Sequence, residues 1–83
     1  MVLSDKNKKN LQVCFGKVLR QLRKDVGISQ GQLALDVGLD RTYISLMERG
    51  LRTPTLFTIY LLAERLGVSA ATIVANVDNL YKS

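Results

Sequence analysis

The sequence predicts an all-α fold: a single domain built from five short helices. Apolar residues recur every three or four positions along most of the chain, and glycines and helix-capping residues interrupt them at short intervals. No segment shows the alternating pattern of a strand. With 83 residues, 47% of them hydrophobic, the chain is long enough for one small core. The helices are expected at about residues 11–25, 29–37, 40–49, 54–66 and 69–81.

The chain opens with a polar and basic segment, residues 1–9, which we expect to be a flexible arm, so that the domain covers residues 10–83. Helical spacing begins directly after this arm, with amide and basic side chains on the opposite face. Its apolar positions are Leu11, Phe15, Val18, Leu19 and Leu22. Gly27 is the expected end of this first helix.

Two short helices are predicted next, on either side of a turn of three or four residues. Ser29 is a good N-cap for the first of them, and Gln32 completes a capping box. Asp40 is a good N-cap for the second, although the same carboxylate can also orient Arg41 or accept from a cytosine amino group. Two short helices joined in this way are the layout of a helix-turn-helix unit.

The spacing of small and apolar residues supports this unit. Ala34 is small enough to let the two helices approach closely, and Gly38 gives the turn a left-handed backbone that other residues resist. Ile44 and Met47 lie on the inner side of the third helix, where they would hold it against the second.

The last two helices follow the loop GLRT. Thr53 is expected to cap the fourth helix, with Pro54 at its first position, where a missing N–H costs nothing. Ser69 is expected to cap the fifth helix. The apolar faces are Leu56, Ile59, Leu62, Ala63 and Leu66 in the fourth helix, and Ile73, Val74, Val77 and Leu80 in the fifth.

The composition excludes several classes of function. The chain has no histidine and one cysteine, which excludes a thiolate or imidazole metal site, an intrachain disulfide and a histidine-based catalytic triad. The carboxylates are scattered singly and form no acid–base pair, so we expect no enzymatic activity and no cofactor. Cys14 lies in the apolar pattern of the first helix and is either a small buried hydrophobe or, alternatively, a reactive thiol.

The hydropathy pattern also bears on location. No apolar run approaches the roughly 18–20 residues of a membrane span. The polar N-terminus is not followed by the apolar core of a secretion signal. We therefore expect a cytoplasmic protein with no membrane partner, and no small-molecule ligand, because the chain is too short for a separate sensor domain.

The positive charge is concentrated near the N-terminus. The formal net charge is +5, and residues 1–28 carry seven Lys or Arg against two Asp, which accounts for all of it. Such a distribution favours a polyanionic partner such as nucleic acid. A solvated basic helix face would give the same pattern, so the charge alone leaves both interpretations open.

One face of the third helix carries side chains suited to reading a nucleic acid. At about 100° per residue, its outer side holds Thr42, Ser45, Leu46 and Arg49, flanked by Arg41 and Tyr43. A helix of two to three turns fits a major groove about 12 Å wide. Arg41 is suited to a bidentate contact with guanine, and Thr42 and Ser45 can hydrogen-bond a base or a phosphate. Leu46 either meets a thymine methyl group or is an ordinary exposed leucine.

The run ISQGQLALDVGLDRTYISLMERG, followed by TPTLFTIYLLAERLGVS, resembles the Xre/phage-repressor family of helix-turn-helix DNA-binding proteins. The resemblance covers about residues 12–75, and within the family LDRTYIS with ERG is similar to the restriction–modification controller proteins. It implies a five-helix, lambda-repressor-like domain with the helix-turn-helix at its second and third helices. It also implies a homodimer that binds double-stranded DNA at a palindromic operator.

Carried over by position, the resemblance implies roles for individual residues. Gln30 opens the second helix, where the family touches phosphate. Arg41, Thr42 and Leu46 fall on base-reading positions. Tyr43 falls at the edge of that surface, where contact with the DNA backbone is expected. The positions at and after the end of the third helix, which hold the sugar-phosphate in the family, are Arg49 and Arg52.

The resemblance also explains an inward carboxylate. Glu48 lies near the inner face of the third helix, where a lone carboxylate would be costly. In the phage repressors the equivalent glutamate pairs with an arginine of the first helix, and Arg23 matches that arginine. A structural Arg23–Glu48 salt bridge is therefore implied. The chain departs from the family at Gly31, which replaces an acidic or polar helix former, and at Leu46, which replaces a residue that is often polar.

The fourth helix carries more apolar residues than one core face needs. Phe57, Tyr60 and Leu61 lie off its core stripe, and we expect them to form a dimer interface with residues of the fifth helix: Val77, Leu80 and Tyr81. The alternative is that a small core wraps all of them. A two-fold axis through this surface would place two recognition helices about 34 Å apart, one turn of DNA.

The sequence therefore predicts a dimeric, sequence-specific transcriptional regulator without enzymatic activity. The alternative is a helical protein–protein interaction module, similar to the partner-binding domain of an antitoxin, with weak or no specific DNA binding.

Overall fold

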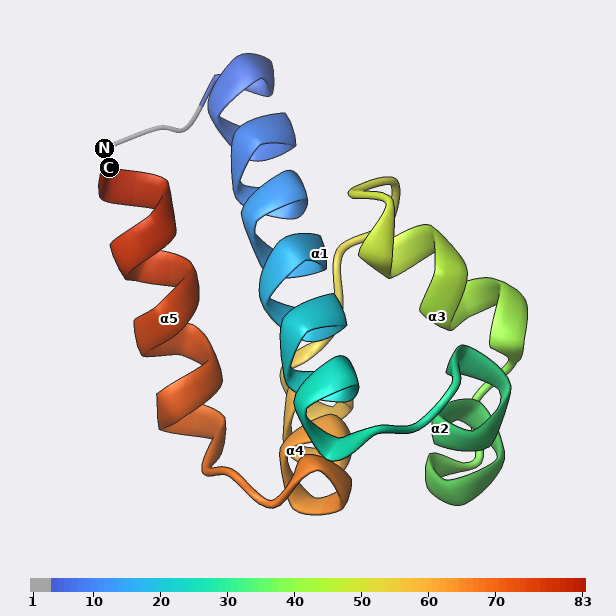
Figure 1. Cartoon of the computed structure of the whole chain (residues 1–83). Helices are drawn as coiled ribbons and strands as arrows, with labels where there is room; N and C mark the ends of the chain where they lie inside the picture. Colours follow the sequence, from blue (N-terminus) through green and yellow to red (C-terminus); the bar gives the residue numbers. More distant parts are fainter. Residues whose placement is uncertain (1–3) are drawn as a thin grey trace.

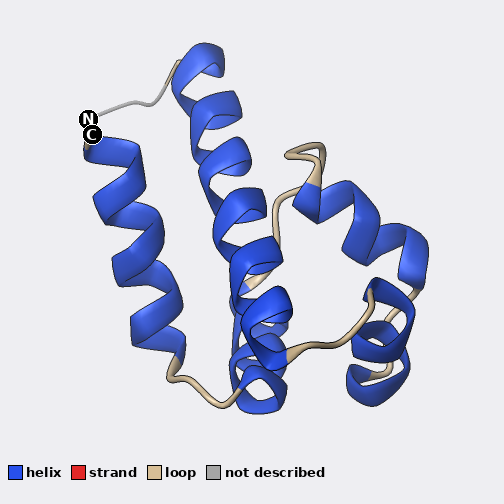
Figure 2. Ribbon diagram, in the orientation of Figure 1, coloured by secondary structure: helices blue, strands red, loops and turns tan. Residues whose placement is uncertain are grey.

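The computed structural model describes residues 4–83, and over that range it consists of five α-helices and no strands (Figure 1, Figure 2). The helices are α1 (Asp5–Val26), α2 (Gln30–Val37), α3 (Arg41–Glu48), α4 (Leu56–Leu66) and α5 (Ala70–Lys82). The predicted all-α, five-helix class is therefore confirmed.

The expected N-terminal arm is wrong for its described part, because α1 already begins at Asp5. The hydroxyl of Ser4 accepts a hydrogen bond from the backbone N–H of Asn7 at 3.2 Å, so Ser4 is the N-cap. Asp5 in the first turn adds a negative charge where the helix dipole favours one. Residues 5–9 thus present their lysines from a helix, and the expected arm residues 1–3 lie outside the described residues.

The start of the fourth helix also differs from the prediction. Thr55, not Thr53, is the N-cap of α4, and its hydroxyl accepts from the N–H of Thr58 at 3.1 Å. Pro54 lies in the preceding loop, where Thr53 instead accepts a hydrogen bond from the Gln12 side chain at 2.6 Å. The three other expected caps are in place, with hydroxyl or carboxylate oxygens accepting from the first turn: Ser29, Asp40 and Ser69.

Every helix contributes to one hydrophobic core. The largest fully buried side chains come from all five elements and are Leu19, Leu33, Ile44, Met47, Leu62 and Ile73. The long helix α1 packs against α5, α3 and α4, while α2 packs against α3 and α4. In Figure 1, α1 and α5 lie side by side on one side of the molecule, and α2 and α3 form a separate pair on the other.

A glycine inside α1 allows this long helix to approach α3 closely. A Cβ atom built on Gly16 would lie 2.5 Å from the carbonyl oxygen of Met47 and 2.6 Å from that of Glu48. Real Cβ atoms do not come this close to backbone oxygens, so only glycine fits here. The end of α3 is therefore placed directly against the backbone of α1.

A surface ion pair ties α2 to α4. Nε of Arg65 donates to Oδ2 of Asp36 at 2.6 Å, and the Gln32 side chain donates to the other oxygen, Oδ1, at 2.7 Å. The hydrogen bond from Arg65, followed by that from Gln32, lowers the pKa of Asp36 below its ordinary value of 3.8. A lowered folded-state pKa means that the pair stabilises the fold above the ordinary carboxyl pKa. That contribution is lost as the pH falls through the folded-state pKa.

We expect Asp36→Asn to destabilise the protein at neutral pH and to have little effect in acid, where the wild-type carboxylate is also neutral. Urea unfolding of both proteins between neutral and strongly acid pH measures the difference. Asp78→Asn is the matched control, because Asp78 pairs with Lys82 inside one helix and links no two elements. A wild-type advantage that persists in acid would contradict this account.

No single helix within residues 4–83 is long and apolar enough to span a membrane. Helices α4 and α5 reach that length and composition only together, across a break where they bend by 106°.

Candidate nucleic-acid interface

The turn between α2 and α3 has the backbone that the sequence requires. Gly38 follows α2 with a φ of 74°, in the left-handed region, and α3 begins three residues later. The carboxylate of Asp40 accepts from the N–H of Thr42 at 2.7 Å, so Asp40 caps α3. The two helices therefore form the predicted helix-turn-helix unit.

The inner face of α3 holds the unit together. Ile44 and Met47 are completely buried, and from α2 Leu33 and Ala34 are buried in the same core. The predicted division of α3 into an inner and an outer face is confirmed for these two residues of the helix.

The outer face of α3 is open to solvent at its N-terminal end. Arg41 and Thr42 are exposed, and Ser45 is half-buried. Together with Gln30 from the start of α2, these three residues line an open hollow of about 210 Å³. The structure thus brings together, on one surface, four of the residues predicted to contact DNA.

The other predicted contact residues do not line this hollow, and their exposures differ. Tyr43 and Leu46 are half-buried, so Leu46 is not the fully exposed side chain that its outer position on the helix suggested. Arg49 is exposed at the end of α3. Arg52 is exposed in the following loop, and its guanidinium donates to the carbonyl of Leu51 at 2.8 Å.

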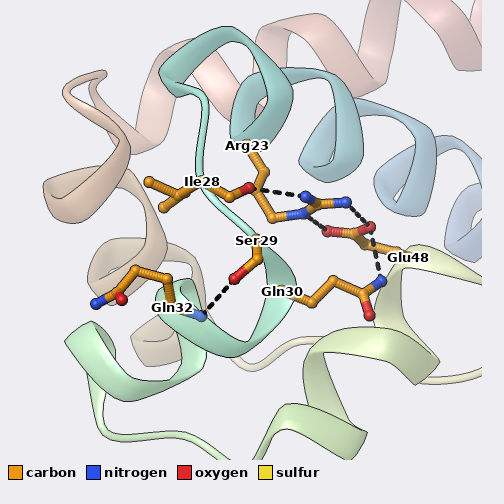
Figure 3. Close-up of polar contacts among 6 residues, drawn as sticks. All are labelled: Arg23, Ile28, Ser29, Gln30, Gln32 and Glu48. Atoms are coloured by element: carbon orange, nitrogen blue, oxygen red, sulfur yellow. Dashed lines mark hydrogen bonds and ion pairs between the residues drawn. The ribbon is translucent and has the colours of Figure 1, made fainter.

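Figure 3 shows the ion pair between Arg23 of α1 and Glu48 of α3. Nε of Arg23 donates to Oε2 of Glu48 at 2.7 Å, and Nη2 donates to Oε1 at 2.9 Å. A third donor, Nη1, reaches the carbonyl of Ile28 at 2.8 Å. The side chains are 11% and 3% exposed, respectively, so both charges are nearly removed from water. The hydrogen bonds to Glu48 raise the pKa of Arg23, which stays charged.

Gln30 extends this network to the outer surface. Its Nε2 donates to Oε1 of Glu48 at 3.0 Å, while its carbonyl oxygen points away from the carboxylate (Figure 3). One side-chain N–H of Gln30 is therefore used inside the protein, and only the other side-chain N–H is left for a contact with a partner. This link could not be predicted from the sequence, because a glutamine at a helix start gives no sign of which carboxylate lies opposite.

The residues predicted to form a dimer interface differ in their exposure to solvent. Phe57 and Tyr60 are 71% and 60% exposed on α4, and Leu61 is half-buried. Val77 is 8% exposed and belongs to the core, so its assignment to an interface is wrong. Ile73 and Val77 are four residues apart on α5, and the inward face they share explains this burial.

The end of α5 is separated from the exposed residues of α4. Leu80 lines a groove between α1 and α5 that includes Val18 and Leu22 but no residue of α4. The hydroxyl of Tyr81 accepts from the Asn7 side chain at 3.1 Å, which ties the last turn of α5 to the first turn of α1. These two residues therefore do not form one patch with Phe57.

Two residues assigned to the core are instead exposed. Leu56 of α4 and Val74 of α5 are 70% and 50% exposed. Leu56 lies six residues before the buried Leu62, a rotation of about 240° around the helix, so the two cannot share a face. Leu56 therefore adds to the apolar surface of α4, which we define as Leu56, Phe57 and Tyr60.

Comparisons with known proteins agree with this geometry. A family model described as "Helix-turn-helix" matches residues 19–73. The chain is 38% identical over 69 residues to y4dJ of Sinorhizobium fredii, an uncharacterized HTH-type transcriptional regulator, covering 83% of this chain and 90% of that protein.

Solved structures show the same fold. The restriction-modification controller protein C.AhdI from Aeromonas hydrophila superposes with a TM-score of 0.72 at 42% identity, covering 75% of this chain and 94% of that one. The controller protein C.Esp1396I, as a tetramer in complex with its natural 35 base-pair operator, gives 0.77 at 30% identity, covering 88% and 96%. The chain therefore belongs to the Xre-type helix-turn-helix family of transcriptional regulators, and the restriction-modification controller proteins are among its relatives.

Proposed function

We propose that the chain is a sequence-specific DNA-binding transcriptional regulator that acts as a homodimer on a palindromic operator in the cytoplasm, without catalysis. The observation that carries this proposal is the open hollow of Gln30, Arg41, Thr42 and Ser45 on a helix-turn-helix unit. The relative C.Esp1396I, which is 30% identical, was solved in complex with its operator.

The chemistry of this surface suits a major groove. Arg41 is the first residue of α3 and is exposed, so its guanidinium can donate two hydrogen bonds to O6 and N7 of a guanine. Thr42 and Ser45 can donate to a base or a phosphate, and the free surface of Leu46 can meet a thymine methyl group. Contacts with the DNA backbone are assigned to Gln30, Tyr43, Arg49 and Arg52.

The carboxylates of this region do not oppose an anionic partner as much as their number suggests. Asp40 is held by its capping hydrogen bond, and Glu48 is nearly buried against Arg23. The surface that faces a duplex is therefore basic, although residues 29–53 carry three Arg against three acids. Binding should weaken steeply with added salt as counterions are released.

We expect Arg41→Ala to weaken binding to the preferred site by about 1–3 kcal/mol and to relax preference at one base pair of each half-site. Selection of bound sites from a random DNA library, followed by gel-shift titration, measures both quantities. Arg20→Ala is the matched control, because Arg20 is an exposed arginine of α1 away from the hollow. Unchanged affinity and preference in Arg41→Ala would show that this residue does not read a base.

The apolar surface of α4 is the proposed dimer interface. Three large apolar side chains that are at least 60% exposed on one helix are costly to leave in water. A two-fold axis there would set the spacing of the two α3 helices.

We expect the double substitution Phe57→Glu and Tyr60→Glu to convert a dimer into a monomer, because burying the new carboxylates in an interface would be unfavourable. Sedimentation equilibrium measures the mass. Leu35→Glu is the matched control, because Leu35 is a 76% exposed leucine on α2 outside this surface. An unchanged dimer in the double variant would place the interface elsewhere.

The apolar surface of α4 also fits the alternative function, a module that binds a different protein. Gel shifts with the DNA upstream of its own gene separate the two functions. Binding that is selective over random duplex and sensitive to salt supports the regulator, whereas no selectivity at low salt supports the module.

A further inference from the structure

Gly31 lies beneath the side chain of Arg41. A Cβ atom built on Gly31 would lie 3.7 Å from Cδ of Arg41, 3.9 Å from its Nε and 3.9 Å from the hydroxyl oxygen of Ser29. The stem of the arginine therefore crosses the first turn of α2 over the glycine. Gly31 is half-buried although it has no side chain.

Neither the backbone nor the packing of α2 requires glycine at this position. Gly31 is helical and is not among the glycines with a positive φ. The distances of 3.7–3.9 Å are ordinary van der Waals separations, so the methyl group of an alanine fits without displacing Arg41. Most residues would also stabilise this helical turn relative to glycine, and an acidic one would gain further from the helix N-terminus. The first turn of α2 nevertheless contains no acidic residue.

A longer acidic side chain would change the state of Arg41. Among residues 4–83, no group accepts a hydrogen bond or forms an ion pair with its guanidinium. Asp40 and Glu48, the carboxylates at the two ends of α3, are held by Thr42 and by Arg23. A glutamate at position 31 would start from a Cβ only 3.9 Å from Nε of Arg41, well within reach of an ion pair.

We propose that position 31, occupied by Gly31, determines specificity at the DNA-reading surface through the absence of an acidic side chain there. By placing no acidic side chain under Arg41, it leaves the guanidinium without an internal partner and available to a base edge. Gly31 itself contacts no base in this arrangement and acts through Arg41. The inference rests on the proposed function, because a free guanidinium at this place matters for sequence preference only if α3 reads DNA.

The test compares Gly31→Ala, Gly31→Gln and Gly31→Glu with the wild type, using site selection and titration of the preferred site. Gly31→Ala and Gly31→Gln should keep the preference at the base pair that Arg41→Ala relaxes. Gly31→Glu should reduce the preference at that same base pair. It should also weaken binding about ten- to hundredfold, the effect of losing one bidentate contact. Adding Arg41→Ala to Gly31→Glu should cause little further loss, because the contact is already absent.

Gln32→Glu is the matched control. It adds the same charge one residue further along α2, where the side chain faces Asp36 rather than Arg41. Thermal unfolding of each variant distinguishes a loss of binding from a loss of the fold. A loss in Gly31→Glu no larger than in Gln32→Glu, an equal loss in Gly31→Gln, or full additivity with Arg41→Ala would each overturn the inference. If the wild-type chain itself selects no site, the proposed function fails instead, so the two failures are distinguishable.

Discussion

Replacement of Gly16 by alanine is expected to lower the free energy of unfolding by about 2–3 kcal/mol, at the upper end of the range for overpacking a tight contact. The added methyl group would lie 2.5 Å from the carbonyl oxygen of Met47 and 2.6 Å from that of Glu48. These are backbone atoms, which cannot rotate away as a flexible side chain can. The clash can be relieved only if α1 and α3 move apart. The cost of that movement is expected to exceed the gain of about 1 kcal/mol that alanine normally brings to a helix interior.

Urea denaturation monitored by circular dichroism measures this loss. Gly31→Ala is the matched control, since it is the same substitution in a helix but meets its nearest atom at 3.7 Å. It should leave stability unchanged or raise it by up to about 1 kcal/mol. Equal stabilities of the two variants would show that the close approach of α1 and α3 is not tight in solution.

Breaking the Arg23–Glu48 ion pair on one side is expected to cost about 3–5 kcal/mol, because the remaining charge stays buried without an opposite charge beside it. Glu48→Ala leaves a guanidinium that is 11% exposed, and Arg23→Ala leaves a carboxylate that is 3% exposed. Removing both residues should cost much less than the sum of the single losses, since no unpaired charge then remains.

A double-mutant cycle on unfolding free energies measures this coupling. The pair Asp36–Arg65 is the comparison, since it also joins two helices but its side chains are 25% and 33% exposed and solvent weakens their attraction. Its coupling should be clearly smaller. Additive losses at Arg23 and Glu48 would contradict a strong internal ion pair.

Local chemistry explains which features of the fold could be predicted from the sequence. Caps such as Ser29 and Asp40 depend on atoms only two or three residues away, so the sequence contains the whole interaction. The same reasoning failed for Thr53, because two threonines flank Pro54 and the contact of Thr53 with Gln12 is 41 residues distant in the chain.

Features that depend on distant elements were harder to predict. Glu48 was recognised as an inward carboxylate, but its partner Arg23 came only from the family resemblance. The role of Gly16 could not be predicted, because a glycine inside a helix indicates only a weak helix former. Its role depends on α3, which packs against it in the folded chain. Val77 was wrongly placed because an apolar residue on a two-faced helix does not reveal whether its own chain or a second copy covers it.

The shared carboxylate of Glu48 determines which positions of the reading surface can be redesigned. Arg41, Thr42 and Ser45 make no side-chain hydrogen bond to the rest of residues 4–83. Under the proposed function, we therefore expect their replacement to alter recognition without disturbing the scaffold. Gln30 is different, because it also supplies a hydrogen bond to a nearly buried oxygen. A library that seeks new operators should therefore vary the three outer residues of α3 freely and hold Gln30 constant, so that retargeting and folding remain separate problems.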